Sequence, residues 1–207
     1  MPALVPIISA MYFGPVELYR VLAQHPKAIV DVGEHYERQS YRTRTHIIGP
    51  NGVQQLVVPI ERRSGEKMPM HSVGLSYAET WAQQHLHAIR SAYGNAPWTI
   101  HFMDGIEDLL LQRHTRLIDL DLASMRLCTN WLKLECELSI SLEYLQAEPS
   151  IHLDLRSSLH PKKALPSSIA PVQPYPQVFA DRHGFRSRMS ILDLLCNTGP
   201  QARSFLL

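Results

Sequence analysis

Apolar residues near the start of the chain occur first in a short run, then at helical spacing, then in a second run. These three segments are residues 4–10, 16–24 and 28–32. Pro15 suits the first position of a helix, where its missing N–H would be unpaired anyway, and Pro26 ends the helix. The pattern predicts a β-α-β unit, whose crossover makes both strands parallel. Ligands of open parallel sheets bind beyond the carboxyl ends of the strands, so we expect a site there.

A hairpin is predicted next. Asn51 and Gly52 separate two apolar stretches, and both residue types tolerate the positive φ angles of tight hairpin turns. Residues 45–59 are therefore predicted to form antiparallel strands. Glu61 to Pro69 is charged and lacks periodicity, which predicts a solvated loop.

Helix signals mark the middle of the chain. Ser76 begins a capping box before an apolar stripe that includes Trp81 and His85. On such a stripe a histidine is more often a core residue than a catalyst. Asp104 is predicted to start a short second helix, and apolar spacing predicts a long third helix from Leu117 to Leu138.

The last third of the chain combines a strand, an irregular segment and a helix. Residues 139–144 alternate as a strand does, and five prolines interrupt residues 161–176, which predicts an ordered binding loop. Ser190 is predicted to cap a final helix, with Asp193 as a second capping residue and Gly199 as its end. The whole pattern predicts one α/β domain, residues 1–207. It combines a mixed sheet, a parallel β-α-β unit, an antiparallel hairpin and a helical middle.

Composition excludes several classes of function. The chain has 207 residues, of which 20 are basic and 19 acidic, so no overall field favours nucleic acid. It has no apolar run long enough for membrane insertion and no signal-peptide pattern at its start, so we expect a cytoplasmic protein. Its three cysteines and its histidines lack metal-ligand spacing, and nucleotide-cofactor motifs are missing, so we expect no metal and no cofactor.

Two arginine-bearing segments could bind an anionic small molecule. Arg42 and Arg44 are two residues apart, so in an extended segment both side chains project from one face and can hold a phosphate or carboxylate. Asp154 and Arg156 repeat this spacing. The alternative is structural: the first pair would be surface residues bound to nearby glutamates, and the second would form a surface ion pair with each other.

Further residues complete the predicted site. Asp154 or His160 would move a proton, and Lys162 would stabilise developing negative charge. Gln39 lies in the same polar segment as the first arginines, and Tyr175 and Gln177 would face one way in an extended loop. We expect all these segments to form one cleft. The candidate set is Gln39, Arg42, Arg44, Asp154, Arg156, His160, Lys162, Tyr175 and Gln177.

Several motifs resemble the bacterial WbqC-like protein family. They are YFGP at 12–15, ERQSYRTR at 37–44, NG at 51–52, LVVP at 56–59, Trp81 with His85 and Tyr93, DLR and HPK within 154–162, YPQVF at 175–179 and SILDLLCNTGP at 190–200. The chain departs from the family pattern at Thr43 and Asp121, where the family usually has asparagine.

The resemblance implies a substrate class and two kinds of function. It links the chain to the biosynthesis of O-antigen and other surface polysaccharides, with transfer of glycine, another aminoacyl group or an acyl group to an amino sugar. The substrate would be a nucleotide sugar or an activated acyl donor. The second hypothesis is a non-catalytic binding or scaffold protein that holds a nucleotide sugar or a partner enzyme.

Overall fold

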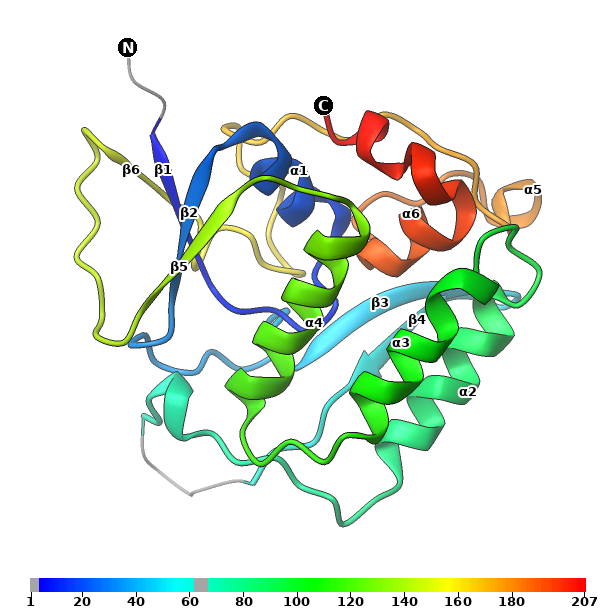
Figure 1. Ribbon diagram of the computed structural model, residues 1–207, viewed down its shortest axis with the longest axis horizontal. Coiled ribbons are helices and arrows are strands. Elements are labelled where there is room, and N and C mark those ends of the chain that lie inside the picture. Colours follow the sequence, from blue (N-terminus) through cyan, green and yellow to red (C-terminus); the bar gives the residue numbers. More distant parts are fainter. Residues whose placement is uncertain (1–3, 62–66) are drawn as a thin grey trace.

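The strands form two separate sheets in the computed structural model, which describes residues 4–61 and 67–207 (Figure 1). One sheet contains β1 (Val5–Ile8), β2 (Lys27–Asp31), β5 (Glu137–Ser141) and β6 (His152–Asp154) in the order β5-β2-β1-β6, with every neighbouring pair parallel. The other is the antiparallel pair β3 (Arg44–Gly49) and β4 (Gly52–Val57). The predicted α/β class is confirmed, with the hairpin forming a sheet of its own.

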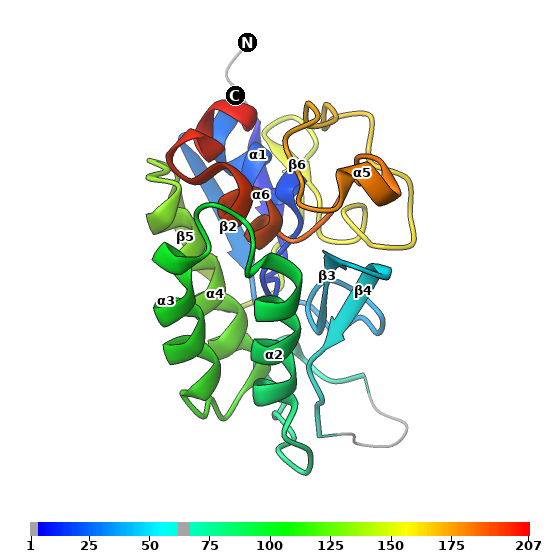
Figure 2. The ribbon, with the colours of Figure 1, turned by 90° about the vertical axis from the view of Figure 1, so that its right-hand side faces the viewer.

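Helices fill the space between and beside these sheets (Figure 2). The α-helices are α1 (Val16–Gln24), α2 (Trp81–Tyr93), α3 (Ile100–Leu111), α4 (Leu117–Trp131), α5 (Ala180–His183) and α6 (Ile191–Thr198), and the 3₁₀ helices are η1 (Met70–Ser72) and η2 (Gly199–Phe205). None of the helices found in the described ranges is long and apolar enough to cross a membrane.

The predicted β-α-β unit is confirmed. Ile7 of β1 pairs with Ile29 of β2 in parallel register, and α1 connects the two strands. Pro15 is the N-cap of α1, one position earlier than predicted, and the helix begins at Val16, whose N–H donates to the carbonyl of Met189.

The Asn51-Gly52 turn produces the predicted hairpin. Gly49 pairs with Gly52 across the turn, and Gly52 has a φ of 102°, which side chains rarely tolerate. Pro59 lies outside the strands, so the hairpin is two residues shorter than predicted at that end.

The predicted start of α2 is wrong. The backbone N–H of Ser76 donates to the carbonyl of Pro59, and that of Leu75 donates to Thr115. Hydrogen bonds to distant segments therefore hold this stretch extended, and the helix begins only at Trp81. The apolar stripe itself is confirmed, because Trp81 and His85 are both buried.

The limits of the next two helices also differ from prediction. Asp104 lies in the second turn of α3, which begins at Ile100 after Thr99. α4 ends at Trp131 because Lys133 has a φ of 51°, a left-handed conformation that stops the helix. Leu138 accordingly belongs to β5.

Candidate functional site

Arg42 forms a buried ion pair beyond the carboxyl end of β1. Its Nε and Nη2 atoms donate to the two carboxylate oxygens of Glu34, at 2.8 and 2.6 Å, and its Nη1 lies 3.4 Å from Glu37 Oε2. Nη2 also donates to Ser9 Oγ at 2.7 Å. Arg42 is 3% exposed, so this is an interior network rather than the surface pair that was the structural alternative.

Arg156 forms a matching network beyond the carboxyl ends of β2 and β6. Its Nε and Nη2 donate to the carboxylate of Asp154, at 2.9 and 2.5 Å, and its Nη1 donates to Asp31. The hydroxyl of Ser9 donates to the Arg156 carbonyl, so Ser9 connects both networks. The parallel sheet thus brings the two predicted segments together at one edge.

The connection from β5 to β6 closes over this edge. Leu145 donates its N–H to Asp31 and accepts from Arg156 Nη1 through its carbonyl. The ring of Tyr144 lies under the Arg156 guanidinium, at 4.5 Å. Gly33 allows this approach, because a Cβ there would lie 2.1 Å from the backbone of Glu143.

The prediction that Arg42 and Arg44 project from one face is wrong. Arg42 lies in a turn, closed by a hydrogen bond from Thr43 N–H to the Ser40 carbonyl, and only Arg44 belongs to β3. Side chains two residues apart share a face only where the backbone is extended at both positions. Arg42 therefore faces the buried carboxylates, whereas Arg44 lines a cleft.

This cleft is cationic. It has a volume of about 540 Å³ and lies between the segment before β3 and the end of β4. Its basic lining residues are Arg38, Arg44 and Lys67, and no acidic residue lines it within the described part of the chain. The Arg44 Nη1 reaches Gln55 Oε1 at 3.3 Å, while its buried Nε has no hydrogen-bond partner among the described residues. The cleft is suited to a phosphate or carboxylate group.

Gln39 connects the cleft to the ion-pair network. It lines the cleft, and its side-chain oxygen accepts a hydrogen bond from Lys162 Nζ. Lys162 in turn donates its backbone N–H to His160 Nδ1 at 3.1 Å. Residues from two distant predicted segments, Gln39 and Lys162, are therefore in direct contact.

His160 and Glu37 form an acid-base pair at this edge. His160 Nε2 lies 3.9 Å from Glu37 Oε1, and the Glu37 side chain is 37% exposed. Because His160 Nδ1 accepts a backbone N–H, Nε2 carries the ring proton and faces Glu37. Burial, helped by Lys163, Arg42 and Lys162 and opposed by Glu37, lowers the pKa of His160, which favours the neutral ring at pH 7.

Asp154 is held in its charged form. Hydrogen bonds and charge from Arg156 lower the pKa of Asp154 despite its partial burial. A carboxylate with a lowered pKa is a poor proton carrier near neutral pH. The geometry therefore suits Asp154 to positioning Arg156.

Tyr175 and Gln177 are directed away from the arginines. The Tyr175 hydroxyl and the Gln177 amide each donate to Asp193 Oδ2 at 2.6 Å, and Gln177 also contacts the backbone of Arg186. The predicted single cleft is wrong at this point, because the loop packs on α6. Asp193 was predicted as a helix cap, yet its side chain binds this loop, while Ser190 does cap α6 through the N–H of Leu192.

Sequence reasoning missed Asp31, Arg38 and Lys67, and it considered Glu34 only as a surface partner of the first arginine pair. Asp31 and Glu34 hold the arginines, and Arg38 and Lys67 complete the cleft. The signal for Asp31 was a carboxylate inside an apolar strand, since such a charge requires a partner. Lys67 lies in the segment expected to be a solvated loop, and its sequence gives no comparable signal.

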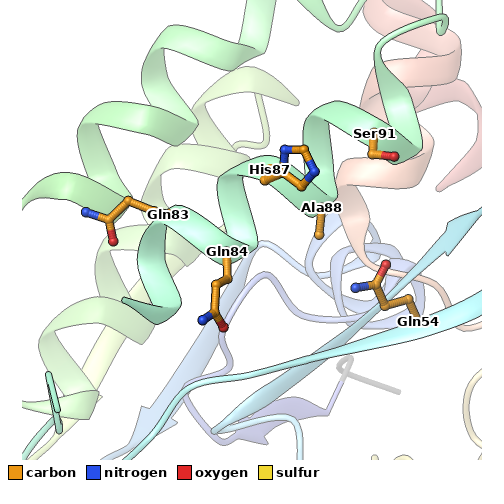
Figure 3. A pocket seen from close by; sticks show the side chains of 6 residues that line it. All are labelled: Gln54, Gln83, Gln84, His87, Ala88 and Ser91. Atoms are coloured by element: carbon orange, nitrogen blue, oxygen red, sulfur yellow. The ribbon is translucent and has the colours of Figure 1, made fainter. Parts of the chain in front are cut away.

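A second hollow lies between the hairpin and α2. Gln54 of β4 lies across from α2 residues that line the hollow, among them Gln84, Ala88 and Ser91 (Figure 3). Its volume is about 420 Å³. Within the described residues, neither an arginine nor a lysine lines this hollow. It is therefore less suited than the cationic cleft to binding an anion.

No metal centre is formed by histidine, cysteine, aspartate or glutamate clusters within residues 4–61 and 67–207. Burial raises the pKa of the thiols of Cys128, Cys136 and Cys196, which disfavours the thiolate that binds metals. We expect exhaustive chelation to leave the melting temperature unchanged, as measured by differential scanning fluorimetry. A large decrease that zinc reverses would contradict this prediction.

One comparison with known proteins gives a match. The model of the WbqC-like protein family matches residues 11–170, a range that contains the ion-pair network, Gln39, Arg44 and Lys162. Neither a curated protein nor a solved structure matches the chain.

Proposed function

Because the chain belongs to the WbqC-like protein family, we propose that it is an enzyme of bacterial surface-polysaccharide (O-antigen) precursor biosynthesis. Family membership suggests a part in polysaccharide-related biosynthesis. The proposed reaction is transfer of an acyl or aminoacyl group, such as glycyl, to an amino sugar. The observation that carries the proposal is the cationic cleft beside an acid-base pair at the carboxyl edge of the parallel sheet.

The cleft would bind the anionic part of a nucleotide sugar or activated acyl donor. Arg38, Arg44 and Lys67 provide three positive charges, and among residues 4–61 and 67–207 no carboxylate lines the cleft to neutralise them. By contrast, the donors of Arg42 and Arg156 already bind Glu34, Asp31 and Asp154. Of the arginines in the predicted set, Arg44 is therefore the one best placed to bind substrate.

Proton transfer is assigned to Glu37 and His160. In the proposed reaction the amino nitrogen of the sugar attacks the acyl carbon, an N–C bond forms, and the bond from that carbon to its leaving group breaks. The nitrogen loses a proton, which passes to the Glu37–His160 pair, and Lys162 stabilises negative charge on the acyl oxygen. Asp154 and Arg156 hold this edge of the sheet in place.

We expect Arg44→Ala to weaken binding of UDP-N-acetylglucosamine while leaving the fold intact. A charged hydrogen bond is worth about 1.5–3 kcal/mol, which corresponds to a roughly 10- to 100-fold higher Kd. Isothermal titration calorimetry gives the Kd, and urea unfolding checks the stability of the variant.

The matched control is Arg126→Ala, which removes an exposed arginine from α4. It should leave the Kd unchanged. If wild type binds the nucleotide sugar and both variants bind it equally well, the cleft is not the substrate site.

A non-catalytic binding protein remains the second candidate. The observation that favours it is that Asp154 and Arg156 bind each other, so neither is free to act on a substrate. Glu37→Gln separates the two functions. A transferase should lose turnover of an amino-sugar acceptor and keep nucleotide-sugar binding, whereas a binding protein shows no turnover in wild type.

A further inference from the structure

A third cavity lies where α3 begins and α4 ends. Among the described residues, it shares no lining residue with the cationic cleft. Its volume is about 370 Å³, and it opens between these helices and η2. Its lining residues are Trp98, His101, Phe102, Trp131, Leu132, Lys133, Gly199, Pro200, Ala202 and Arg203. Cavities that bind small molecules begin at about 300 Å³.

Aromatic rings line this cavity, which we call the aromatic cavity. Two of the three tryptophans of the chain are among them. Trp98 packs against His101 with ring centroids 5.6 Å apart, and Trp131 packs against Phe102 at 5.0 Å. Such rings offer flat faces to a planar ligand.

Each indole packs directly against the backbone of a glycine. A Cβ on Gly199 would lie 2.3 Å from Trp98 Cδ2, and a Cβ on Gly105 would lie 2.8 Å from Trp131 Cζ2. Each ring therefore lies directly against backbone on one side, which leaves no room for a side chain there.

Two cationic side chains line the same cavity. Lys133 is exposed and has the left-handed φ of 51° that ends α4. Its carbonyl accepts a hydrogen bond from Arg203 Nη1 at 3.0 Å, which holds the arginine at the cavity. The Arg203 Nη2 also lies 3.9 Å from Glu135, whose side chain is 89% exposed and only weakly engaged.

We propose that the aromatic cavity binds a planar aromatic ring that carries an anionic group, as a nucleoside monophosphate does. The ring would lie against the indoles, and its phosphate or carboxylate would contact Lys133 and Arg203. A free sugar fits less well, because within residues 4–61 and 67–207 neither a carboxylate nor a side-chain amide lines the cavity to accept hydrogen bonds from hydroxyl groups. This site is additional to the cationic cleft.

The test uses AMP as the aromatic anion and the intrinsic fluorescence of the full chain as the signal. Trp98 and Trp131 line the cavity, whereas Trp81 is 2% exposed on α2. AMP should quench the fluorescence in a saturable way. Adenosine should bind at least about tenfold more weakly than AMP, since the charged contacts are lost, and ribose 5-phosphate should fail to displace AMP.

Variants separate the cavity from the rest of the surface. Lys133→Gly removes the cation at a position whose φ suits glycine, so the protein should fold and bind AMP about tenfold more weakly. Arg203→Gln should act in the same direction. The matched control, Lys27→Gln, removes an exposed lysine of β2 and should leave the Kd unchanged.

Three results would overturn the proposal. They are the absence of saturable quenching by AMP, displacement of AMP by ribose 5-phosphate at equal concentration, and equal Kd values for Lys133→Gly and Lys27→Gln. If Arg44→Ala weakens AMP binding and Lys133→Gly does not, AMP occupies the cationic cleft. That outcome would reject the aromatic cavity as the site and leave the proposed function standing.

Discussion

Replacing Arg42 by alanine is expected to lower the free energy of unfolding by about 3–5 kcal/mol, because it leaves a carboxylate buried without its partner. Arg42 and Glu34 are 3% and 5% exposed, and two hydrogen bonds join them. Ser9 would lose its bond to the same guanidinium. Urea unfolding followed by circular dichroism at pH 7 measures the loss.

A double variant shows that the loss comes from the unpaired charge. Arg42→Met with Glu34→Leu removes both charges at similar volume, so it should recover most of the stability lost in Arg42→Ala. Arg44→Ala, which removes a partly exposed arginine two residues away, should cost well under about 1 kcal/mol. A loss below about 1 kcal/mol for Arg42→Ala would show that the ion pair does not hold this edge of the sheet.

Local patterns predicted β1, β2 and the hairpin, but they placed β5 at residues 139–144 and did not predict β6. The apolar runs flanking α1 predicted parallel strands, and parallel strands bring their carboxyl ends to one edge. Arg42 and Arg156 meet there, 114 residues apart in sequence, through the hydroxyl of Ser9 and the carbonyl of Arg156. The parallel pairing of β1 and β2 could be read from the sequence, whereas the places of β5 and β6 in the sheet could not.

The partner of each charged side chain could not be predicted in the same way. A period-two spacing placed Arg42 with Arg44, yet a four-residue turn at Ser40–Thr43 rotates Arg42 into the interior. Long-range hydrogen bonds decide such turns, and spacing does not reveal them. The loop containing Tyr175 failed as a prediction for a related reason, since Asp193 on α6 offers its polar groups a buried partner.

Asp121 on α4 is an acidic residue in a fully buried position. Its side chain is 0% exposed, and neither carboxylate oxygen has a hydrogen-bond partner within the described residues. Burial raises the pKa of Asp121 well above its usual value; Arg42 acts against this shift and Glu34 adds to it.

Asp121→Asn is expected to stabilise the protein, and the gain should increase with pH. Because the folded pKa of Asp121 is raised, the folded state binds a proton that the unfolded state releases above about pH 4. The contribution of Asp121 to the free energy of unfolding therefore decreases as the pH rises from about 4 toward its pKa in the folded protein. Asparagine does not titrate, so the variant lacks this decrease. The buried amide has no ionisation cost, so variant and wild type should be about equally stable near pH 4 and differ most at pH 8. Urea unfolding of wild type and variant at pH 5 and pH 8 measures both effects, with Asp104→Asn as the control, because Asp104 is exposed on α3. A variant less stable than wild type at pH 8, or an equal difference at both pH values, would mean that Asp121 is ionised and satisfied in the folded protein.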